Sequence, residues 1–185
     1  MKRNIGSIIG LYPTPLAVVG TIVNGNPNYM LVGHLGIIGH DRIMVSLSKT
    51  HYSNQGIREM QVLTVSIVDE GMLTKADYVG CVSGSKVNKS EVFKYHAGET
   101  GAPVIDEAPV VMECVVDDIY DTEGFESFIC KIKNVYAEEA VLNGDGKINY
   151  HELKPILFEM PTYEYLKTGE VIGKCMSFGK EQKNE

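Results

Sequence analysis

The sequence is poor in the features that mark zinc proteins, nucleic-acid binders and membrane proteins. Its four cysteines are widely separated and form no C-x-x-C pair, so their spacing gives no support for a zinc site. Its 17 lysines and arginines are outnumbered by 24 aspartates and glutamates, and the net charge of -7 argues against a nucleic-acid partner. Its longest apolar run, from Met30 to Gly39, is interrupted by His34 and is too short to span a bilayer. We therefore expect no metal site of this kind, no nucleic acid and no membrane.

Sequence signatures of several enzyme classes are also missing. We find no Ser-His-Asp order, no metal-binding helix motif, and no G-x-G-x-x-G or P-loop sequence. The first four residues carry charge like the start of a signal peptide, but prolines follow instead of a clean apolar segment and a cleavage site. Hydrophobic residues make up 44% and charged residues 22% of the 185 residues, which is ordinary globular composition. We expect one domain over residues 1–185 and a cytoplasmic location.

The stretch from Arg42 to Met60 organises the rest of the chain. Residues 42–48 alternate between apolar and other side chains, as a half-buried strand does. Residues after the next short turn predict a helix that begins at Ser53 or Asn54, either of which can cap free N–H groups. A strand that leads through a turn into a helix N-terminus creates an anion site, because unpaired N–H groups and the positive end of the helix dipole converge there.

Side chains of this turn add further hydrogen-bond donors. Hydroxyl groups, an ammonium group and an imidazole come from Ser46, Ser48, Lys49, Thr50, His51 and Ser53. A phosphate monoester would suit such a set. The alternative is that these are ordinary polar residues at a strand end, with Ser53 as a simple helix cap. The density of donors favours an anion site.

The residues before this stretch predict a hairpin. Residues 16–23 form a nearly continuous apolar run, as expected for a strand covered on both faces. Asn24-Gly25 follows at once and is typical of a hairpin turn. The returning residues 28–38 contain glycines, which indicate close approach of another group to the backbone. A flat ligand lying against this strand would suit their spacing.

The residues after the stretch predict more strands and few helices. Strand-like runs follow at 62–68, 110–119 and 125–137, and a helix is predicted at 74–81. About six strands and three short helices without regular strand-helix alternation predict a mainly β fold, a closed barrel.

A second polar turn lies between residues 83 and 90. It carries three serines and two lysines, and Ser83, Lys86 and Lys89 could help the first turn to wrap a phosphate or sugar. The alternative is a solvated surface loop, which often has this composition.

Residues 143–152 look like part of an EF-hand calcium loop. With Gly146 as the central glycine, oxygen-bearing residues fall on ligand positions at Asn143, Asp145, Asn149 and Glu152. However, the first ligand position holds Val141, which offers no carboxylate, and no second loop exists to pair with this one. We therefore favour a Gly-Asp-Gly β-turn between two strands over a calcium site.

With these features in place, the chain resembles the flavoredoxin branch of the flavin reductase like, FMN-binding split-barrel family over nearly its whole length. The resemblance rests on the order and spacing of short motifs. These are Tyr12-Pro13, Val19-Gly20-Thr21, Asn28-Tyr29-Met30, Ser46 to Tyr52, Asp77 to Gly80, Ser83 to Lys86 with Lys89, and Glu113-Cys114. The resemblance implies a six-stranded Greek-key split barrel that forms a homodimer, with FMN in a groove at the dimer interface.

The resemblance also implies which residues bind FMN. The turn at 46–53 would hold the phosphate, residues 28–31 and the backbone near Ser46 would lie along the isoalloxazine ring, and the second polar turn would close the site. The implied cofactor-binding residues are Asn28, Tyr29, Met30, Leu31, Ser46, Leu47, Ser48, Lys49, Thr50, His51, Ser53, Ser83, Lys86 and Lys89.

The implied function is an FMN-dependent oxidoreductase of the flavin reductase or flavoredoxin type. Electrons from NADH, NADPH or another carrier would pass through FMN to a flavin, a metal complex, oxygen or a redox partner protein. No side chain need act as acid or base, because the chemistry belongs to the cofactor. The alternatives are an electron carrier without nicotinamide activity and a non-catalytic flavin-binding module.

Two positions depart from what is common in the family. Relatives often carry a hydroxyl where this chain has Leu31 and an aromatic ring where it has His34. These changes imply a different reduction potential or different substrate access. The simpler interpretation of His34 is a partly buried histidine whose hydrogen bonds are satisfied by backbone.

Overall fold

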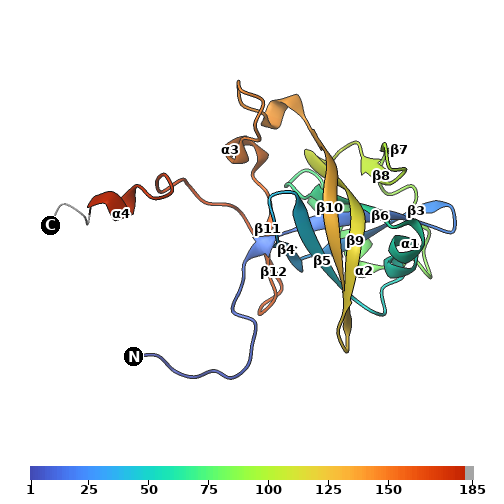
Figure 1. The fold of residues 1–185 in the computed structure, drawn as a ribbon, viewed down its shortest axis with the longest axis horizontal. Coiled ribbons are helices and arrows are strands. Elements are labelled where there is room, and N and C mark those ends of the chain that lie inside the picture. The colour runs from blue at the N-terminus through green and yellow to red at the C-terminus, as the bar shows by residue number, and fades with distance from the viewer. Residues whose placement is uncertain (182–185) are drawn as a thin grey trace.

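The computed structural model describes residues 1–181 and shows a mainly β fold built on one seven-stranded antiparallel sheet (Figure 1). The strand order in this sheet is β3-β2-β6-β9-β10-β5-β4. The strands are β2 (Ala17–Val23), β3 (Asn26–Val32), β4 (Leu35–Ile37), β5 (Arg42–Ser48), β6 (Val62–Ile67), β9 (Val110–Asp121) and β10 (Phe125–Ala137). The sheet curls around a common core, so the predicted mainly β barrel is confirmed.

The sheet has seven strands rather than six because one stretch of chain is divided between its two edges. β3 pairs with β2 at one edge, and β4, which starts three residues after β3 ends, pairs with β5 at the other edge. Gly33 and His34 lie in the break, where the Ser46 N–H donates to the His34 carbonyl oxygen at 3.0 Å. At this break, which we call the seam, the chain passes from one edge of the curled sheet to the other.

Strand β2 is buried on both faces, which explains its nearly continuous apolar sequence. Val19 packs in the barrel core with Val45 and Leu63. Val18 points the other way, into a second core that includes Phe93. Alternate residues of β2 therefore pack into two different cores, because successive side chains of a strand point to opposite faces of the sheet.

The predicted Asn-Gly hairpin joins β2 to β3. Val23 pairs with Asn26, which leaves Asn24 and Gly25 as a two-residue turn with φ angles of 51° and 77°. Positive φ at both turn residues is what a hairpin of this length needs to match the strand twist. The hairpin prediction is confirmed.

Two helices of two to three turns flank the barrel. Helix α1 (Ser53–Met60) begins at one of the two predicted residues and places Ile57 in the barrel core. Its predicted cap is wrong: no side chain caps the helix, because Ser53 and Asn54 lie inside it and bond to other segments. Helix α2 (Leu73–Cys81) covers the outer face of β3 through Ala76 and Val79 in the second core.

Shorter elements complete the fold. They are β1 (Thr14–Pro15), β7 (Tyr95–Ala97), β8 (Pro103–Ile105), the 3-10 helix η1 (Glu139–Val141), α3 (Tyr150–Leu153), β11 (Leu157–Glu159), β12 (Glu164–Leu166) and α4 (Phe178–Glu181). Strands β1, β11 and β12 form a small sheet, and β7 pairs with β8. The N-terminal arm, residues 1–13, and the segment that follows β12 up to residue 181 run away from the barrel on the same side (Figure 1). None of the helices in residues 1–181 has the length and hydropathy needed to cross a membrane.

The stretch that resembles a calcium loop is a tight turn. Leu142 and Ile148 form a single β-bridge across it, and the Asn143 side chain accepts the Lys147 N–H at 2.8 Å. The Asp145 carboxylate pairs with the Lys147 ammonium at 2.7 Å. The predicted β-turn is present, although one bridge rather than two full strands flanks it.

Candidate functional site

Two adjoining cavities lie beside the seam of the barrel. One has a volume of about 290 Å³ and a largely apolar lining, and we call it the apolar cavity. The other has a volume of about 360 Å³ and a more polar lining, and we call it the polar cavity. Leu31 of β3 and His51 of the turn after β5 line both cavities, so the two meet at these side chains.

The turn between β5 and α1 forms one wall of the polar cavity. Thr50, His51, Tyr52 and Ser53 line this wall. The Ser53 hydroxyl oxygen accepts a hydrogen bond of 2.7 Å from the Asn28 amide, so its own proton is available to a ligand. Within residues 1–181, the N–H groups of Tyr52 and Ser53 donate no hydrogen bond. This wall therefore offers hydroxyl and backbone donors together at the start of a helix.

The turn after α2 forms the opposite wall of the polar cavity. Ser83 and Gly84 line it, and the Ser83 hydroxyl oxygen lies 2.9 Å from that of Ser85. Gly84 packs directly on Asn28: a Cβ atom at this position would lie 2.1 Å from the Asn28 amide oxygen. Asn28 thus spans the two walls, since its nitrogen holds Ser53 and its oxygen abuts Gly84.

Lys89 places an ammonium group at the edge of the polar cavity. The residue is only 4% exposed, and its Nζ donates to the carbonyl oxygens of Tyr29 at 2.9 Å and Val79 at 2.8 Å. An ammonium group has a third donor, which these contacts leave free. Burial lowers the pKa of Lys89 to about 8. The group therefore remains mostly protonated at neutral pH and supplies a positive charge that an anion can use.

His51 stands where the two cavities meet and carries little charge of its own. Partial removal from water, and secondarily the charge of Lys89, lower the pKa of the His51 imidazole below its ordinary value of 6.5. The ring is therefore mostly neutral at pH 7 and can donate or accept a hydrogen bond.

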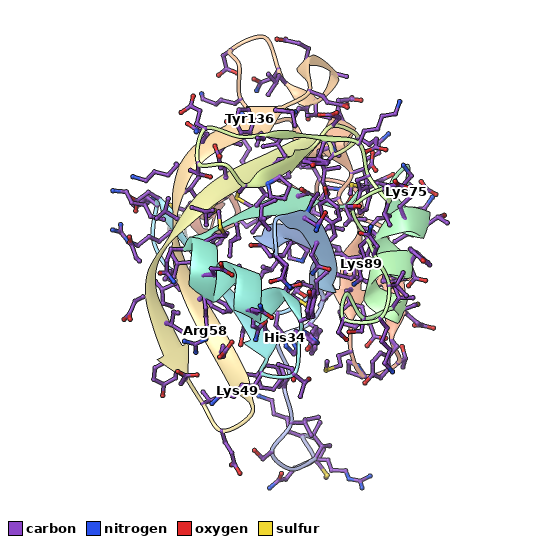
Figure 2. The ribbon with its side chains drawn as sticks, turned by 90° about the vertical axis from the view of Figure 1, so that its right-hand side faces the viewer. His34, Lys49, Arg58, Lys75, Lys89 and Tyr136 are labelled. Carbon is purple, nitrogen blue, oxygen red and sulfur yellow. The ribbon has the colours of Figure 1, made fainter. Side chains whose placement is uncertain are left out.

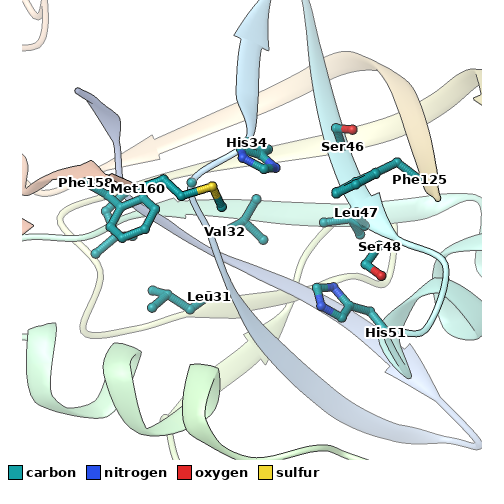
Figure 3. A pocket seen from close by; sticks show the side chains of 12 residues that line it. Leu31, Val32, His34, Ser46, Leu47, Ser48, His51, Phe125, Phe158 and Met160 are labelled. Carbon is teal, nitrogen blue, oxygen red and sulfur yellow. The ribbon is translucent and has the colours of Figure 1, made fainter. Parts of the chain in front are cut away.

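The apolar cavity has a lining that suits an uncharged group (Figure 3). Aliphatic, aromatic and thioether side chains form most of its walls. They are Leu16, Leu31, Val32, Leu47, Phe125, Phe158 and Met160. Polar groups are few, and they come from His34, Ser46, Ser48 and His51. Together the two cavities can hold an elongated molecule with a flat apolar body and an anionic end.

Most of the predicted site residues line these cavities. Asn28, Met30, Leu31, Thr50, His51, Ser53, Ser83 and Lys89 line the polar cavity, and Leu31, Ser46, Leu47, Ser48 and His51 line the apolar one. Three predicted residues do not place their side chains there. The Tyr29 ring is buried in the second core, 5.2 Å from the Phe93 ring between centroids, and only its backbone reaches Lys89.

Two predicted lysines lie apart from the cavities. The Lys49 ammonium lies 3.5 Å from the Asp121 carboxylate on β9, whereas Lys89 lies deeper, toward α2 (Figure 2). Lys86 lines another cavity, which adjoins the polar cavity and shares Asn28, Tyr52, Gly84 and Lys89 with it. Both lysines are exposed.

Several residues of the site had no signal in the sequence. Phe125 comes from the start of β10, and Phe158 and Met160 come from the chain's last small sheet and the turn after it. Each lies more than 70 residues from Ser48 in the sequence, so local patterns could not connect them. Gly84 stood inside a recognised polar turn, but its contact with Asn28 depends on the tertiary fold.

His34 lies at the barrel seam and is only partly buried. Its Nε2 is 2.8 Å from the hydroxyl oxygen of Tyr12. The expectation that backbone groups would satisfy this ring is wrong, because its observed hydrogen-bond partner is a side chain from the N-terminal arm.

Comparisons with known proteins match most of this chain. Residues 9–159 match the Flavin reductase like domain. A search of curated proteins finds no match. Among solved structures, flavoredoxin from Methanosarcina acetivorans is 31% identical, with 98% of this chain and 99% of that chain covered and a TM-score of 0.93.

Two further structures are similar. Flavoredoxin of Desulfovibrio vulgaris (Miyazaki F) is 32% identical, with 97% of this chain and 100% of that chain covered and a TM-score of 0.89. An FMN-binding protein from Thermus thermophilus is 21% identical, covers 94% of this chain and 98% of its own, and shares the fold with a TM-score of 0.77. The family match includes the whole seven-stranded sheet and the polar cavity. The resemblance drawn from short motifs is confirmed, and the chain belongs to the flavin reductase like domain family.

Proposed function

We propose that this protein is an FMN-binding oxidoreductase that holds the cofactor across the two cavities. The observation that carries the proposal is the junction of a donor-rich polar cavity and a largely apolar cavity at Leu31 and His51. FMN has a matching division, with a flat ring system at one end and a phosphate at the other. The family supports a flavin as the ligand.

The polar cavity is proposed to bind the phosphate. Thr50 and Ser53 offer hydroxyl donors, the free N–H groups of the first wall add backbone donors, and Lys89 supplies positive charge. Ser48 shares a hydrogen bond of 3.0 Å with Thr50 and orients that hydroxyl. The Lys49 ion pair with Asp121 is exposed and worth little, so Lys49 can turn toward a phosphate at small cost. Ser83 and Lys86 would close the site from the other wall.

The apolar cavity is proposed to hold the isoalloxazine ring. Leu31 and Leu47 offer apolar surface to it, and the backbone of β3 and of Ser46 runs alongside. Bound FMN would supply the electron-transfer chemistry. The protein's own residues bind and orient the cofactor and remove water from around its ring.

NADH or NADPH is the proposed electron donor, and a flavin, a metal complex, oxygen or a redox partner protein is the proposed acceptor. A second candidate is an electron carrier that never reacts with a nicotinamide. The names of the two relatives that are about one-third identical favour this candidate, since both are flavoredoxins.

We further propose that two copies of this chain form a homodimer with the FMN groove near their interface. The N-terminal arm supports this proposal, because Ile5, Ile8, Ile9 and Leu11 are exposed on a segment without regular structure. Ile37 at the end of β4 is 87% exposed as well. A second copy would remove this apolar surface from water. Light scattering on the full chain tests this, and a monomer at all concentrations would contradict it.

The experiment that tests the function is the visible absorption spectrum of the purified protein, with the released pigment identified. We expect FMN, bound one per chain. A colourless protein that also takes up no added FMN would refute the proposal.

Anaerobic mixing with NADH or NADPH then separates the two candidates. Bleaching of the flavin spectrum identifies a reductase. An unbleached spectrum, with reduction by dithionite and reoxidation by an electron acceptor, identifies a carrier. Flavin that no donor and acceptor can cycle would indicate a non-catalytic binding module.

A further inference from the structure

A buried carboxylate joins β10 to helix α1, close to the turn that is proposed to hold the phosphate. Glu126, the second residue of β10, is only 8% exposed. Its Oε2 accepts a hydrogen bond of 2.7 Å from the side-chain amide of Asn54 in α1. Its Oε1 accepts two hydrogen bonds from the Arg58 guanidinium, at 2.9 and 2.6 Å. Glu126 lines neither the polar cavity nor the apolar cavity, so the binding of FMN proposed above does not use it.

Asn54 connects this carboxylate to the turn. The Asn54 amide nitrogen that donates to Glu126 also donates to the Ser48 carbonyl oxygen, at 3.0 Å. The backbone N–H of His51 donates to the same carbonyl oxygen, at 3.0 Å. Ser48 is the last residue of β5 and Asn54 lies in the first turn of α1, so these bonds tie the two ends of the turn together.

The orientation of the Asn54 amide indicates that both of its donated bonds matter. Its Oδ1 is buried and has no hydrogen-bond partner within the described part of the chain. The opposite orientation would place this oxygen against the Glu126 carboxylate and the Ser48 carbonyl, which are both acceptors. A buried acceptor without a partner is unfavourable, and here it accompanies the full use of the nitrogen.

Arg58 compensates the negative charge of Glu126 close to the proposed anion site. Without this partner, a buried carboxylate would be left unpaired, which is strongly unfavourable. Arg58 also lies 3.4 Å from one carboxylate oxygen of Asp121, and Lys49 lies 3.5 Å from the other. Figure 2 shows Arg58 and Lys49 on the same side of the barrel. Asp121 therefore keeps a cationic partner when Lys49 turns toward a phosphate.

We propose that Glu126 is a positioning residue for the FMN phosphate: held by Arg58, it fixes Asn54, and Asn54 keeps the turn at residues 48–53 in its anion-binding shape. This inference rests on the proposed FMN function. Glu126 acts through Asn54 and does not contact the ligand. Its loss should therefore weaken the binding of a flavin that carries a phosphate and leave the binding of riboflavin unchanged.

Paired titrations of the flavin-free protein with FMN and riboflavin test this role. Glu126→Gln keeps the size of the side chain, but it presents an NH₂ group to one of the two donors that Glu126 accepts. We expect FMN affinity to fall about tenfold in this variant and in Asn54→Ala, with riboflavin affinity unchanged. A wild-type ratio of the two affinities in both variants would overturn the proposal. Equal losses for both flavins would also overturn it, because they would show a merely structural role.

A double variant and a matched control sharpen the comparison. Glu126→Gln/Asn54→Ala should lose no more FMN affinity than Asn54→Ala alone, because the two residues act through one contact. Additive losses would show that Glu126 does not act through Asn54. The control is Asp117→Asn, which changes a carboxylate on β9 that accepts a bond of 2.9 Å from Nε of Arg42. It should bind both flavins as the wild type does.

Arg58 provides a test that does not depend on the folding of a variant at a buried position. Its side chain is 44% exposed, so Arg58→Met removes the guanidinium from a largely accessible position. We expect this variant to lose about tenfold in FMN affinity relative to riboflavin, and Arg58→Lys, which keeps the charge, to lose less. A wild-type ratio of affinities in Arg58→Met would contradict the proposal.

Inorganic phosphate probes the shape of the turn without a flavin. In nitrogen-15 NMR spectra of the flavin-free wild type, phosphate should shift the backbone N–H signals of Tyr52 and Ser53. The same phosphate concentration should shift them much less in Asn54→Ala, and equal shifts in the two proteins would overturn the role of Asn54. A wild type that binds no FMN would refute the proposed function itself. A wild type and a Glu126→Gln variant that prefer FMN over riboflavin equally would refute the positioning role alone.

Discussion

The side-chain amide of Asn28 donates a hydrogen bond of 2.7 Å to the hydroxyl oxygen of Ser53, the first residue of α1. This bond joins the strand that follows the hairpin to the turn that is proposed to hold a phosphate. On its other side, the Asn28 amide oxygen lies against Gly84 of the second turn. One amide therefore sets the spacing between the two walls of the polar cavity.

Replacing Gly84 tests this spacing. In Gly84→Ala the new Cβ would lie 2.1 Å from the Asn28 amide oxygen, so the second turn must move away from Asn28. Overpacking of this kind costs about 1–3 kcal/mol. We expect FMN affinity to fall about ten- to a hundredfold, measured by fluorescence titration. Gly144→Ala, where the added Cβ would meet no atom within 4 Å outside its chain neighbours, is the matched control and should bind as the wild type does. An unchanged affinity in Gly84→Ala would show that the two walls need not meet at Asn28.

The double variant Lys49→Ala/Thr50→Ala tests where the phosphate binds. It removes one charge and one hydroxyl beside the first wall of the polar cavity. Because these groups would contact only the phosphate, we expect FMN affinity to fall far more than riboflavin affinity. The measurement is a pair of titrations with the two flavins on the same preparation. Equal losses for both flavins would place the phosphate elsewhere.

The pKa of Lys89 predicts how FMN affinity depends on pH. Burial lowers this pKa to about 8 in the unliganded protein, so above pH 8 the amine is mostly neutral and must take up a proton before it can attract phosphate. FMN affinity should therefore fall as the pH rises above 8, by about tenfold per pH unit at most. Riboflavin affinity should stay constant over the same range. In Lys89→Met the ratio of FMN affinity to riboflavin affinity should be lower at pH 7 than in the wild type, and it should not change with pH. If this ratio changes with pH equally in the wild type and in Lys89→Met, the pH dependence of FMN binding comes from a group other than Lys89.

Glu113 predicts a dependence of stability on pH. This buried carboxylate on β9 accepts four hydrogen bonds, two from Thr100 at 2.6 Å, one from Asn134 at 2.8 Å and one from Tyr136 at 2.9 Å. Burial alone would raise its pKa, but the hydrogen bonds outweigh burial and hold the pKa below the ordinary 4.5. A depressed pKa contributes stability above the unfolded value, and that stability is lost as the pH falls through the folded value.

Thermal unfolding of Glu113→Gln measures this contribution. At pH 7 we expect the variant to be less stable by about 1–3 kcal/mol, since an amide cannot accept all four bonds. The difference from the wild type should shrink as the pH falls below 4.5, because Glu113 of the unfolded wild-type chain gains a proton there and the folded carboxylate follows at its lower pKa. Glu123→Gln, in the exposed hairpin between β9 and β10, is the control and should show no such trend. A constant difference at all pH values would mean that the charge of Glu113 contributes nothing.

The local elements were predictable because local interactions determine them. The alternation of residues 42–48 placed Val45 and Leu47 in the core and Ser46 and Ser48 at the cavity, as β5 shows. The Asn24-Gly25 turn has the positive φ angles that its residues favour. The helix after the turn begins at Ser53, one of the two starting residues that its sequence predicts. The predicted cap was wrong because both polar side chains form hydrogen bonds with residues from other segments: Ser53 with Asn28, and Asn54 with Glu126.

By itself, the sequence determined most strands of the main sheet, the hairpin, the donor-rich turn and, through ordered motifs, the family. Only the tertiary structure decided which of those donors share a cavity. It turned the Tyr29 ring into the core and left its carbonyl oxygen to hold Lys89, and it joined Lys49 to Asp121. It also brought Tyr12 from the N-terminal arm to His34 at the seam. Strand periodicity acts over a few residues, whereas these contacts depend on how distant segments pack, and no local pattern encodes that packing.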